Sequence, residues 1–342
     1  MKHSYAAPSA LLAITCLPLA LGAVDLSYAP EQGSRWLRVF ECSTTAEFDE
    51  LSVVMGGQPI DSQFLPQIEV EFRDTLHLEV TDELRGVELA RPTLVHRTYG
   101  DVWREVEESM EVVGMGGADG PSVSQGEGRS PLEGRTVAFE WSEDGEDVAA
   151  SWVERESDDD LLEGLVGDLD LLAWLPEGAV KVGDSWTVPA SMMDGLLVPG
   201  GELSIELEGQ NLETFEPKGD DDAELDGDLV LRLEEIQDAD GRRFAVVSIE
   251  GDFTSELTYA GDLEDVPVAD GTTSVTDKIE YELEGELIWD LNFAIMSALE
   301  VTAETLTTSH AIKDDGQEGP AFESIATLLG ETRVSITVEP AD

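Results

Sequence analysis

Apolar and polar residues alternate with a period of two along most of the chain after residue 34. In residues 67–81, Ile68, Val70 and Phe72 fall on one side of an extended chain, and acidic residues dominate the other side. Because successive side chains of a strand point to opposite faces, this pattern predicts a long half-buried antiparallel strand, or two strands joined by a bend at Arg73-Asp74. Comparable patterns predict strands at residues 34–41, 47–55, 87–99, 203–207, 253–259, 276–289, 295–308 and 333–338. Residues 102–113 and 322–329 fit either a strand or a short helical segment.

Two hairpins are predicted from their turn sequences. Asp144-Gly145 separates two strand-like segments, and Asp-Gly is a strong signal for a two-residue hairpin turn. The implied register pairs side chains on one face, namely Trp141 with Val148, Phe139 with Ala150 and Val137 with Trp152. Residues 229–233 and 244–249 predict a second hairpin, in which Gly241 supplies the left-handed backbone conformation.

A helical pattern interrupts the strands at residues 157–177. Its leucines recur at the spacing of one helical face: Leu161, Leu162, Leu165, Leu169 and Leu172. Ser157 is a suitable N-cap, and the acidic residues that follow it suit the positive end of a helix dipole. Pro176 and Gly178 end the pattern. We expect an amphipathic helix that packs across a sheet, and the alternative is a helix that covers the mouth of a cavity inside a curved sheet.

These elements predict a mainly β protein, that is, a β-rich α+β fold. Consecutive hairpins favour antiparallel meanders that form curved sheets in two lobes, with the single helix packed on a sheet. The expected organisation is a signal peptide at residues 1–23, an N-terminal β-rich lobe at 24–156, the central helix at 157–177 and a C-terminal β-rich lobe at 178–342.

The N-terminal residues indicate export. Lys2 and His3 precede an apolar run at residues 10–23, which Pro18 interrupts. The run is too short for a membrane span and has the form of a secretory signal peptide. Cys16 lacks the context of a lipid-attachment cysteine. The chain is therefore expected to be secreted or periplasmic, with no membrane span.

The charge of the chain is extreme, because 75 acidic residues and 19 basic residues give a formal net charge of −56. A field of this sign repels nucleic acid phosphates and anionic lipid surfaces, so a nucleic acid partner is not expected. It attracts cations, including Ca²⁺, and basic partners. The composition also fits an acidic protein whose surface is adapted to salty water, where counterions screen the repulsion.

No catalytic constellation is visible in the sequence. Beyond the signal region, Cys42 is the single cysteine, and we expect it to be a small buried residue without a disulfide partner. The three histidines His77, His96 and His310 lack the spacing of metal ligands. Close pairs of carboxylates carry no information in so acidic a chain, although they leave a carboxylate-dependent hydrolase open.

One acidic segment partly matches a calcium-binding loop. Asp222, Glu224 and Asp226 place oxygen ligands at the first, third and fifth positions, Gly227 stands at the sixth, and Asp228 follows. The twelfth position is Leu233, where such loops carry a bidentate glutamate. The match predicts Ca²⁺ as the only candidate cofactor, and a solvated acidic loop is the alternative.

Several segments resemble a group of uncharacterised exported proteins of planctomycete-type bacteria. They are residues 161–176 (LLEGLVGDLDLLAWLP), 180–186 (VKVGDSW), 242–251 (RRFAVVSIEG) and 281–291 (YELEGELIWDL), together with a Pro-Gly-Gly loop at 199–201. In that group a glycine-bearing turn tends to follow the last of these segments, whereas here Asn292-Phe293-Ala294 follows it. The resemblance implies an exported β-rich protein and implies no activity.

These observations favour a non-catalytic exported protein that binds an apolar ligand or a partner protein in the cell envelope. A large apolar pocket beneath the central segment would favour this function. The alternatives are a carboxylate-dependent hydrolase, which needs two buried carboxylates facing each other in a cleft, and a calcium-dependent surface or matrix protein.

Overall fold

The computed structural model describes residues 22–88, 91–113, 121–142, 147–154, 158–210, 225–239, 241–260, 272–314 and 322–341. The described strands are β1 (Arg35–Met55), β2 (Gln58–Pro59), β3 (Gln67–Glu88), β4 (Arg91–Val113), β5 (Ser122–Arg129), β6 (Thr136–Trp141), β7 (Val148–Trp152), β8 (Ser185–Pro189), β9 (Glu208–Gln210), β10 (Leu225–Ala239), β11 (Arg242–Ala260), β12 (Thr272–Asp290), β13 (Ile295–Asp314) and β14 (Phe322–Pro340). The helical elements are short: the 3₁₀ helices η1 (Ser62–Phe64), η2 (Asp159–Leu162), η3 (Leu172–Trp174) and η4 (Ala190–Met193), and the α-helix α1 (Asp194–Leu197).

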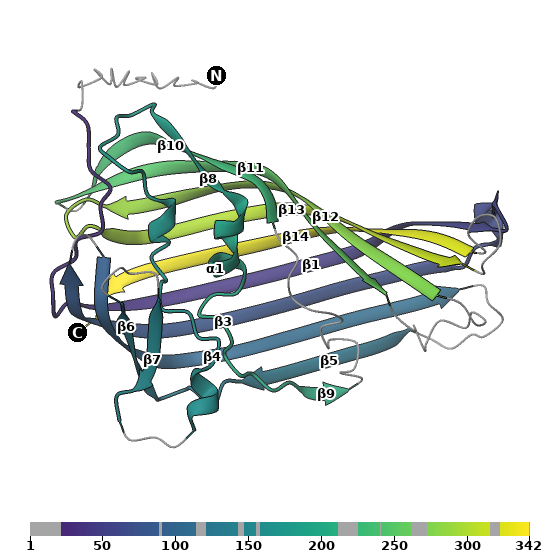
Figure 1. Ribbon diagram of the computed structural model, residues 1–342, viewed down its shortest axis with the longest axis horizontal. Coiled ribbons are helices and arrows are strands. Elements are labelled where there is room, and N and C mark those ends of the chain that lie inside the picture. Colours follow the sequence, from purple (N-terminus) through teal and green to yellow (C-terminus); the bar gives the residue numbers. More distant parts are fainter. Residues whose placement is uncertain are drawn as a thin grey trace, which may run out of the picture.

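All 14 strands belong to one antiparallel sheet (Figure 1), and its main path runs β7-β6-β4-β3-β1-β14-β13-β12-β11-β10-β8. Neighbouring long strands are mostly consecutive in sequence, as the predicted meanders require. The exception is the central pair, in which β1 lies antiparallel to β14, from Trp36 opposite Pro340 to Met55 opposite Phe322. The first and last long strands are therefore neighbours in the middle of the sheet.

The predicted fold class is confirmed in its main statement, a mainly β antiparallel protein, and several strands are longer than their predictions. Predicted strands 34–41 and 47–55 are one strand, β1, which carries a bulge between Phe48 and Glu50. Residues 322–329 join 333–338 in β14, and residues 102–113 belong to β4. The predicted strand at residues 203–207 is wrong, because these residues pair with no strand and β9 begins at Glu208. Polar residues at the middle of each long strand interrupted the apolar pattern without interrupting the backbone ladder.

Both predicted hairpins are present. Strands β6 and β7 pair with the predicted register: Val137 with Trp152, Phe139 with Ala150 and Trp141 with Val148. Their turn residues 143–146 lie outside the described residues. Strands β10 and β11 form the second hairpin, and Gly241 takes a positive φ of 79° in its turn.

The two predicted lobes contribute to the same sheet. β1, β3 and β4 come from the N-terminal half and β10 to β14 from the C-terminal half, and the β1–β14 pairing joins them without a break. The domain boundaries at residues 156 and 178 stay a prediction.

The central amphipathic helix predicted at residues 157–177 is wrong. From residue 158 onward this segment contains only the 3₁₀ turns η2 and η3 between extended stretches, and Ser157 lies outside the described residues. Gly164 and Leu171 adopt positive φ values of 72° and 51°, which an α-helix does not tolerate. The Asp168 carboxylate accepts hydrogen bonds from the backbone N–H groups of Asp170 and Leu172, at 2.8 and 3.1 Å. Such local side-chain bonds compete with helical ones.

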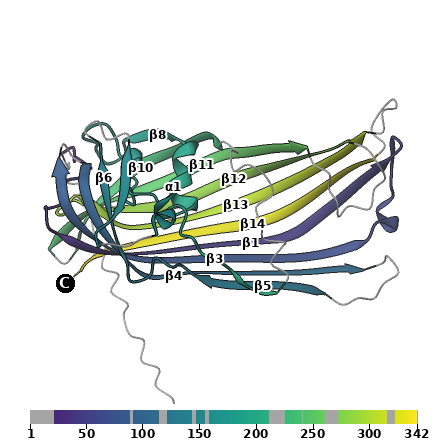
Figure 2. The same cartoon turned by 60° about the horizontal axis from the view of Figure 1, so that its bottom comes forward.

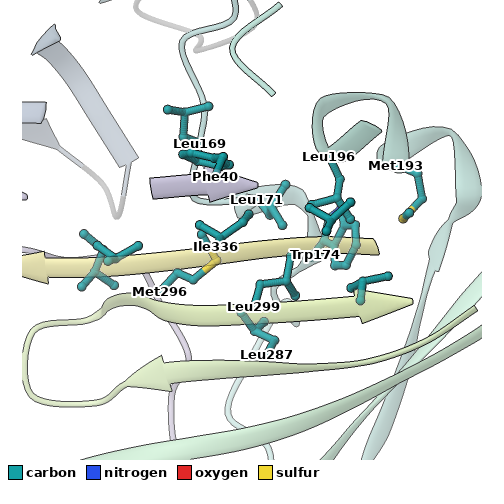
Figure 3. Packing of buried hydrophobic residues seen from close by; sticks show 14 of the residues in the cluster. Phe40, Leu169, Leu171, Trp174, Met193, Leu196, Leu287, Met296, Leu299 and Ile336 are labelled. Atoms are coloured by element: carbon teal, nitrogen blue, oxygen red, sulfur yellow. The ribbon is translucent and has the colours of Figure 1, made fainter. Parts of the chain in front are cut away.

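This segment nevertheless covers the sheet. We call residues 158–180 and 190–205 the cover, and we call the sheet face beneath them the inner face. Leu169, Leu171 and Trp174 of the cover are buried against Phe40 and Ile336 of the central strands (Figure 3). The same cluster contains Phe139 from one end of the strand order and Leu231 from the other, so the sheet curves around the cover (Figure 2).

The turn between β12 and β13 forms without a glycine. Ala294 takes a positive φ of 52°, a conformation that usually favours glycine. The Asp290 carboxylate accepts hydrogen bonds from the backbone N–H groups of Asn292 and Phe293, at 2.7 and 3.0 Å. These two bonds hold the turn in shape without a glycine.

Among the described residues, no helix combines the length and the apolar character that crossing a membrane requires.

Candidate functional site

A cavity of about 420 Å³ lies between the inner face and the cover. The sheet contributes Cys42, Thr44, Asp74, Leu76 and Arg104, and the cover contributes Leu197, Val198, Gly201, Glu202, Leu203 and Ile205. We call it the inner cavity. Its lining combines apolar side chains with the polar Thr44, Asp74, Arg104 and Glu202, and its size is in the range of small-molecule sites.

The strand register explains the floor of the inner cavity. Cys42 on β1 stands opposite Leu76 on β3, and Leu76 stands opposite Arg104 on β4, so the three side chains share the inner face. Arg104 binds Asp74 through two hydrogen bonds, of 3.0 Å from Nε and 2.6 Å from Nη2. Each charge in the floor is therefore matched by its neighbour. An apolar ligand could pass over this pair without displacing an isolated ion.

Cys42 is buried and makes no disulfide, as predicted. Burial raises the pKa of its thiol to about 11, and the nearby Asp74 carboxylate adds to the rise while Arg104 opposes it. The thiol is therefore protonated at neutral pH, and it contributes a small apolar surface to the cavity in place of a nucleophile.

A backbone crossing forms the roof of the inner cavity. The N–H of Val166 donates to the carbonyl of Gly200 at 3.0 Å, and the N–H of Glu202 donates to the carbonyl of Gly164 at 3.0 Å. Gly201 has a φ of 77°, and a Cβ atom there would lie 2.1 Å from the Gly164 carbonyl oxygen. Only glycine lets the two stretches approach this closely, so the Pro-Gly-Gly loop closes the cover over the cavity.

A second and larger cavity, of about 910 Å³, shares the lining residue Arg104 with the first. Residues 203–208 run between the two cavities: Leu203 and Ile205 line the inner cavity, and Ser204, Glu206 and Glu208 line the larger one. This alternation follows from the extended backbone of the segment. Ser130 Oγ holds the segment in place by donating to the Leu203 carbonyl at 2.5 Å.

The larger cavity is acidic, and we call it the acidic cavity. Its lining residues include the acidic Glu105, Glu127, Asp158, Glu206 and Glu208, and the strand register places Glu105 and Glu127 on the sheet face opposite Arg104. Its two arginines are already engaged, since Arg104 binds Asp74 and Arg129 lies 2.8 Å from Glu133 and 3.3 Å from Asp101. The five carboxylates of the lining are therefore left without a matching cation from these two arginines.

A buried ionic cluster attaches the cover to the sheet at the side of Leu169. Asp170 of the cover binds Arg38 of β1 through two hydrogen bonds of 2.8 Å, and Arg38 also donates to Asp82 of β3 at 3.1 Å. Arg97 of β4 binds the other side of Asp82, at 2.8 and 3.0 Å. Two arginines and two aspartates thus neutralise one another in the core, where unpaired charges are very costly.

Arg97 also holds the backbone of the cover. Its Nη1 donates to the Val166 carbonyl at 2.8 Å and its Nη2 to the Gly167 carbonyl at 2.9 Å. Its guanidinium carbon lies 4.8 Å from the centre of the Phe139 ring. These contacts fix the extended stretch before Asp168 and replace the helical hydrogen bonds that this stretch lacks.

Burial raises the pKa of Asp170, although the Arg38 guanidinium opposes the rise. Burial also raises the pKa of Asp168, and there the two backbone N–H donors oppose it. Asp82 and Asp170 are buried carboxylates close together, as a hydrolase would need. Both are bound by arginine, and neither lines the two cavities described above. Their geometry fits an anchor for the cover.

The predicted calcium loop is only partly within the described residues. Asp222 and Glu224 lie outside them, whereas Asp226 and Asp228 are exposed residues of strand β10. Asp228 stands at one end of a row of facing carboxylates that crosses the sheet: Asp228, Asp252, Glu282, Glu304 and Glu331. Within the described parts of the chain, no three His, Cys, Asp or Glu side chains are grouped so that they could hold a metal ion. The calcium site stays a prediction.

Sequence reasoning missed both cavities and the ionic cluster. One usable signal was present: Arg38 occupies an inward position of a period-two strand, between Trp36 and Phe40. An arginine at such a position needs a buried acidic partner. The identity of that partner, Asp170, depends on a contact across 132 residues, which the pattern along the chain does not contain.

No protein-family description matches the chain, and no curated protein matches it. Among solved structures, an outer membrane channel from Pseudomonas putida F1 aligns with 92% of this chain and 99% of that chain at 11% identity and a TM-score of 0.18. The outer membrane protease OmpT from Escherichia coli aligns with 92% and 99% at 7% identity and a TM-score of 0.17. OccK7 (OpdD) from Pseudomonas aeruginosa aligns with 90% and 99% at 9% identity and a TM-score of 0.18. Similarity at this level does not establish a shared fold.

Proposed function

We propose that this protein is an exported, non-catalytic binding protein that holds an apolar ligand between its cover and the inner face of its sheet. The inner cavity carries the proposal, because it is a space of about 420 Å³ with apolar side chains from both the sheet and the cover, and the charges that the sheet contributes to it, Asp74 and Arg104, are paired. Apolar surface that a ligand covers in such a space contributes binding free energy through the hydrophobic effect.

The inner face supports the binding of a long ligand. Its apolar side chains continue beyond the floor of the cavity, with Phe48 on β1, Val70 on β3 and Ile279 on β12. The rings of Phe253 and Tyr281 stack there with their centres 4.6 Å apart. The long strands run well past the cover (Figures 1 and 2), so these apolar side chains give an extended ligand further contacts on the same face of the sheet.

Export is supported by the signal-like pattern of residues 10–23 and by the resemblance to exported proteins of planctomycete-type bacteria. N-terminal sequencing of the mature protein tests this part of the proposal. A chain that begins after residue 22 or 23 and is recovered from the envelope fraction is the expected result. Recovery from the cytosol with Met1 still attached would contradict export.

Ligand binding is tested with the neutral fluorescent probe diphenylhexatriene. The wild-type protein should bind it with enhanced fluorescence, and the double variant Leu197→Trp/Ile205→Trp should bind at least tenfold more weakly because two indoles occupy the inner cavity. Mass spectrometry of the protein purified from its native source should reveal a co-purifying apolar molecule that the variant lacks.

The matched control is Val182→Trp/Val230→Trp, which places the same groups at positions that are 45% and 46% exposed and lie outside the cavity. Thermal unfolding must show that both double variants fold. Equal probe binding by wild type, cavity variant and control would refute binding in the inner cavity.

A further inference from the structure

We infer that the ligand of the inner cavity carries an uncharged, oxygen-bearing head group, such as that of a monoacylglycerol, and that Arg104 binds this group. This inference rests on the proposed function and adds the chemical class of the ligand. It depends on two features of the inner cavity, the hydrogen-bond donors that Arg104 keeps available and the charges that the lining already holds.

Arg104 keeps hydrogen-bond donors that Asp74 does not use. Its two bonds to Asp74 come from Nε and Nη2, which lie on one edge of the planar guanidinium. A guanidinium carries five N–H groups, so three of them, on Nη1 and Nη2, point away from Asp74. The side chain is 40% exposed and lines the inner cavity. A ligand there can therefore offer an oxygen acceptor to Arg104 without breaking the ion pair.

The position of Arg104 suits a ligand that is part polar and part apolar. The two bonds to Asp74 fix the plane of the guanidinium, because a carboxylate binds this edge in one geometry. Leu76 stands opposite Arg104 in the sheet, and Leu203 and Ile205 of the cover line the same cavity. One molecule can therefore place an apolar chain against these side chains and an oxygen atom on Arg104.

The charges of the lining disfavour an ionic head group. The charged residues of the lining are Arg104, Asp74 and Glu202. An anionic head would accept hydrogen bonds from Arg104, but it would add a third negative charge to two carboxylates and one guanidinium. A cationic head offers no acceptor and is repelled by the guanidinium. An ester or hydroxyl oxygen accepts from Arg104 without adding charge, so the uncharged head group fits both conditions.

Three probes with chains of similar length test the head group: monododecanoylglycerol, dodecanoate and dodecyltrimethylammonium, each below its aggregation concentration. Binding is measured by displacement of diphenylhexatriene in about 1 M NaCl, where a Debye length of about 3 Å screens the general field of the molecule. We expect the neutral probe to bind at least tenfold more tightly than either ion.

The outcomes of this experiment separate the inference from the proposed function. If diphenylhexatriene itself does not bind, the proposed function fails. If diphenylhexatriene binds and the three probes displace it equally, apolar binding stands and the inference about the head group is overturned. Tightest binding of either ion would overturn the inference in the same way.

A double variant tests the role of Arg104. Asp74→Leu/Arg104→Leu removes both members of the pair and leaves no unpaired charge in the floor. It should bind monododecanoylglycerol at least tenfold more weakly and bind diphenylhexatriene, which has no oxygen, within twofold of wild type. If thermal unfolding shows that this variant does not fold, Arg104→Lys replaces it. Lysine keeps the charge beside Asp74 but lacks the planar set of donors, so binding of monododecanoylglycerol should weaken at least threefold.

The matched control is Lys278→Leu/Glu280→Leu, which removes an ion pair of 2.9 Å that does not line the inner cavity. It should bind both compounds as the wild type does. Unchanged binding of monododecanoylglycerol by the folded Arg104 variant would overturn the inference. Equal weakening by the control variant would also overturn it, because the loss would then not depend on the cavity.

Discussion

Individual residues attach the cover of this protein by ionic contacts inside an apolar core. Arg38 and Arg97 are each 1% exposed, and their partners Asp82 and Asp170 are 3% and 6% exposed. Such a cluster contributes little net stability compared with apolar residues of the same shape, because desolvation offsets the attraction. The cluster fixes the position of the cover, because each guanidinium can donate its hydrogen bonds to only one arrangement of carboxylate and carbonyl groups.

Removing one member of this cluster should be much more costly than removing an exposed ion pair. Arg38→Met leaves Asp170 buried without its bidentate partner, and the free energy of unfolding in urea should fall by about 3–5 kcal/mol. Arg129→Met, which removes a 60% exposed arginine, should change it by less than about 1 kcal/mol. Similar losses for the two variants would show that the cluster does not anchor the fold.

The raised pKa values of Asp168 and Asp170 make a prediction about pH. A carboxyl whose pKa is higher in the folded than in the unfolded chain favours folding in its protonated form. Its contribution is present below the ordinary carboxyl pKa and is lost as the pH rises through the raised value.

Unfolding in urea, measured stepwise from about pH 7 down to about pH 4, should therefore show a rising free energy of unfolding from these groups. Asp168→Asn should make this dependence shallower. An unchanged slope in Asp168→Asn would contradict the direction given for its pKa.

At the scale of elements, most of the long strands could be predicted, whereas β5 and the cover could not. Period-two alternation and the Asp-Gly turn sufficed to give the β6–β7 register residue by residue, because each strand packs one face against the core. The leucines of residues 161–172 also fit a helical face, yet the chain there follows a different path. Its backbone is fixed by Arg97, by Asp168 and by the Gly164–Gly201 crossing. Two of these three interactions join residues distant in sequence, so a local pattern cannot contain them.

The crossing at Gly201 can be tested by one methyl group. Gly201→Ala combines a positive φ with a Cβ position 2.1 Å from a backbone oxygen, and it should destabilise the protein by more than about 2 kcal/mol. Gly33→Ala has a comparable φ of 86° but open space around it, so the cost there should be about 1 kcal/mol. Diphenylhexatriene binding should fall only in Gly201→Ala, because that glycine forms the roof of the inner cavity. Equal losses of stability in the two variants would contradict the close crossing.

At the scale of the whole molecule, the outer surface of the sheet places negatively charged side chains next to one another. The row Asp252, Glu282, Glu304 and Glu331 places carboxylates directly opposite one another on four neighbouring strands. Like charges in facing positions destabilise a sheet. Counterions must therefore take part in the stability of the folded protein.

Salt should stabilise this protein. Raising NaCl from about 0.01 M to about 1 M shortens the Debye length from about 30 Å to about 3 Å, which screens the facing carboxylates. The thermal unfolding midpoint should rise by about 5 °C or more. The variant Glu282→Gln/Glu304→Gln should start from a higher midpoint at low salt and respond less to added salt. A midpoint independent of salt in both proteins would contradict electrostatic strain in the sheet.

The pairing of β1 with β14 has a consequence for how the molecule is made. Translation delivers β1 almost three hundred residues before its central neighbour, so the two halves of the sheet remain unjoined until synthesis is nearly finished. During that interval the exposed edge of β1 is a template for pairing with other chains. A pathway that keeps the nascent polypeptide extended until its final strand emerges would protect it from aggregation, and the dense negative charge along each strand would help by keeping incomplete chains apart.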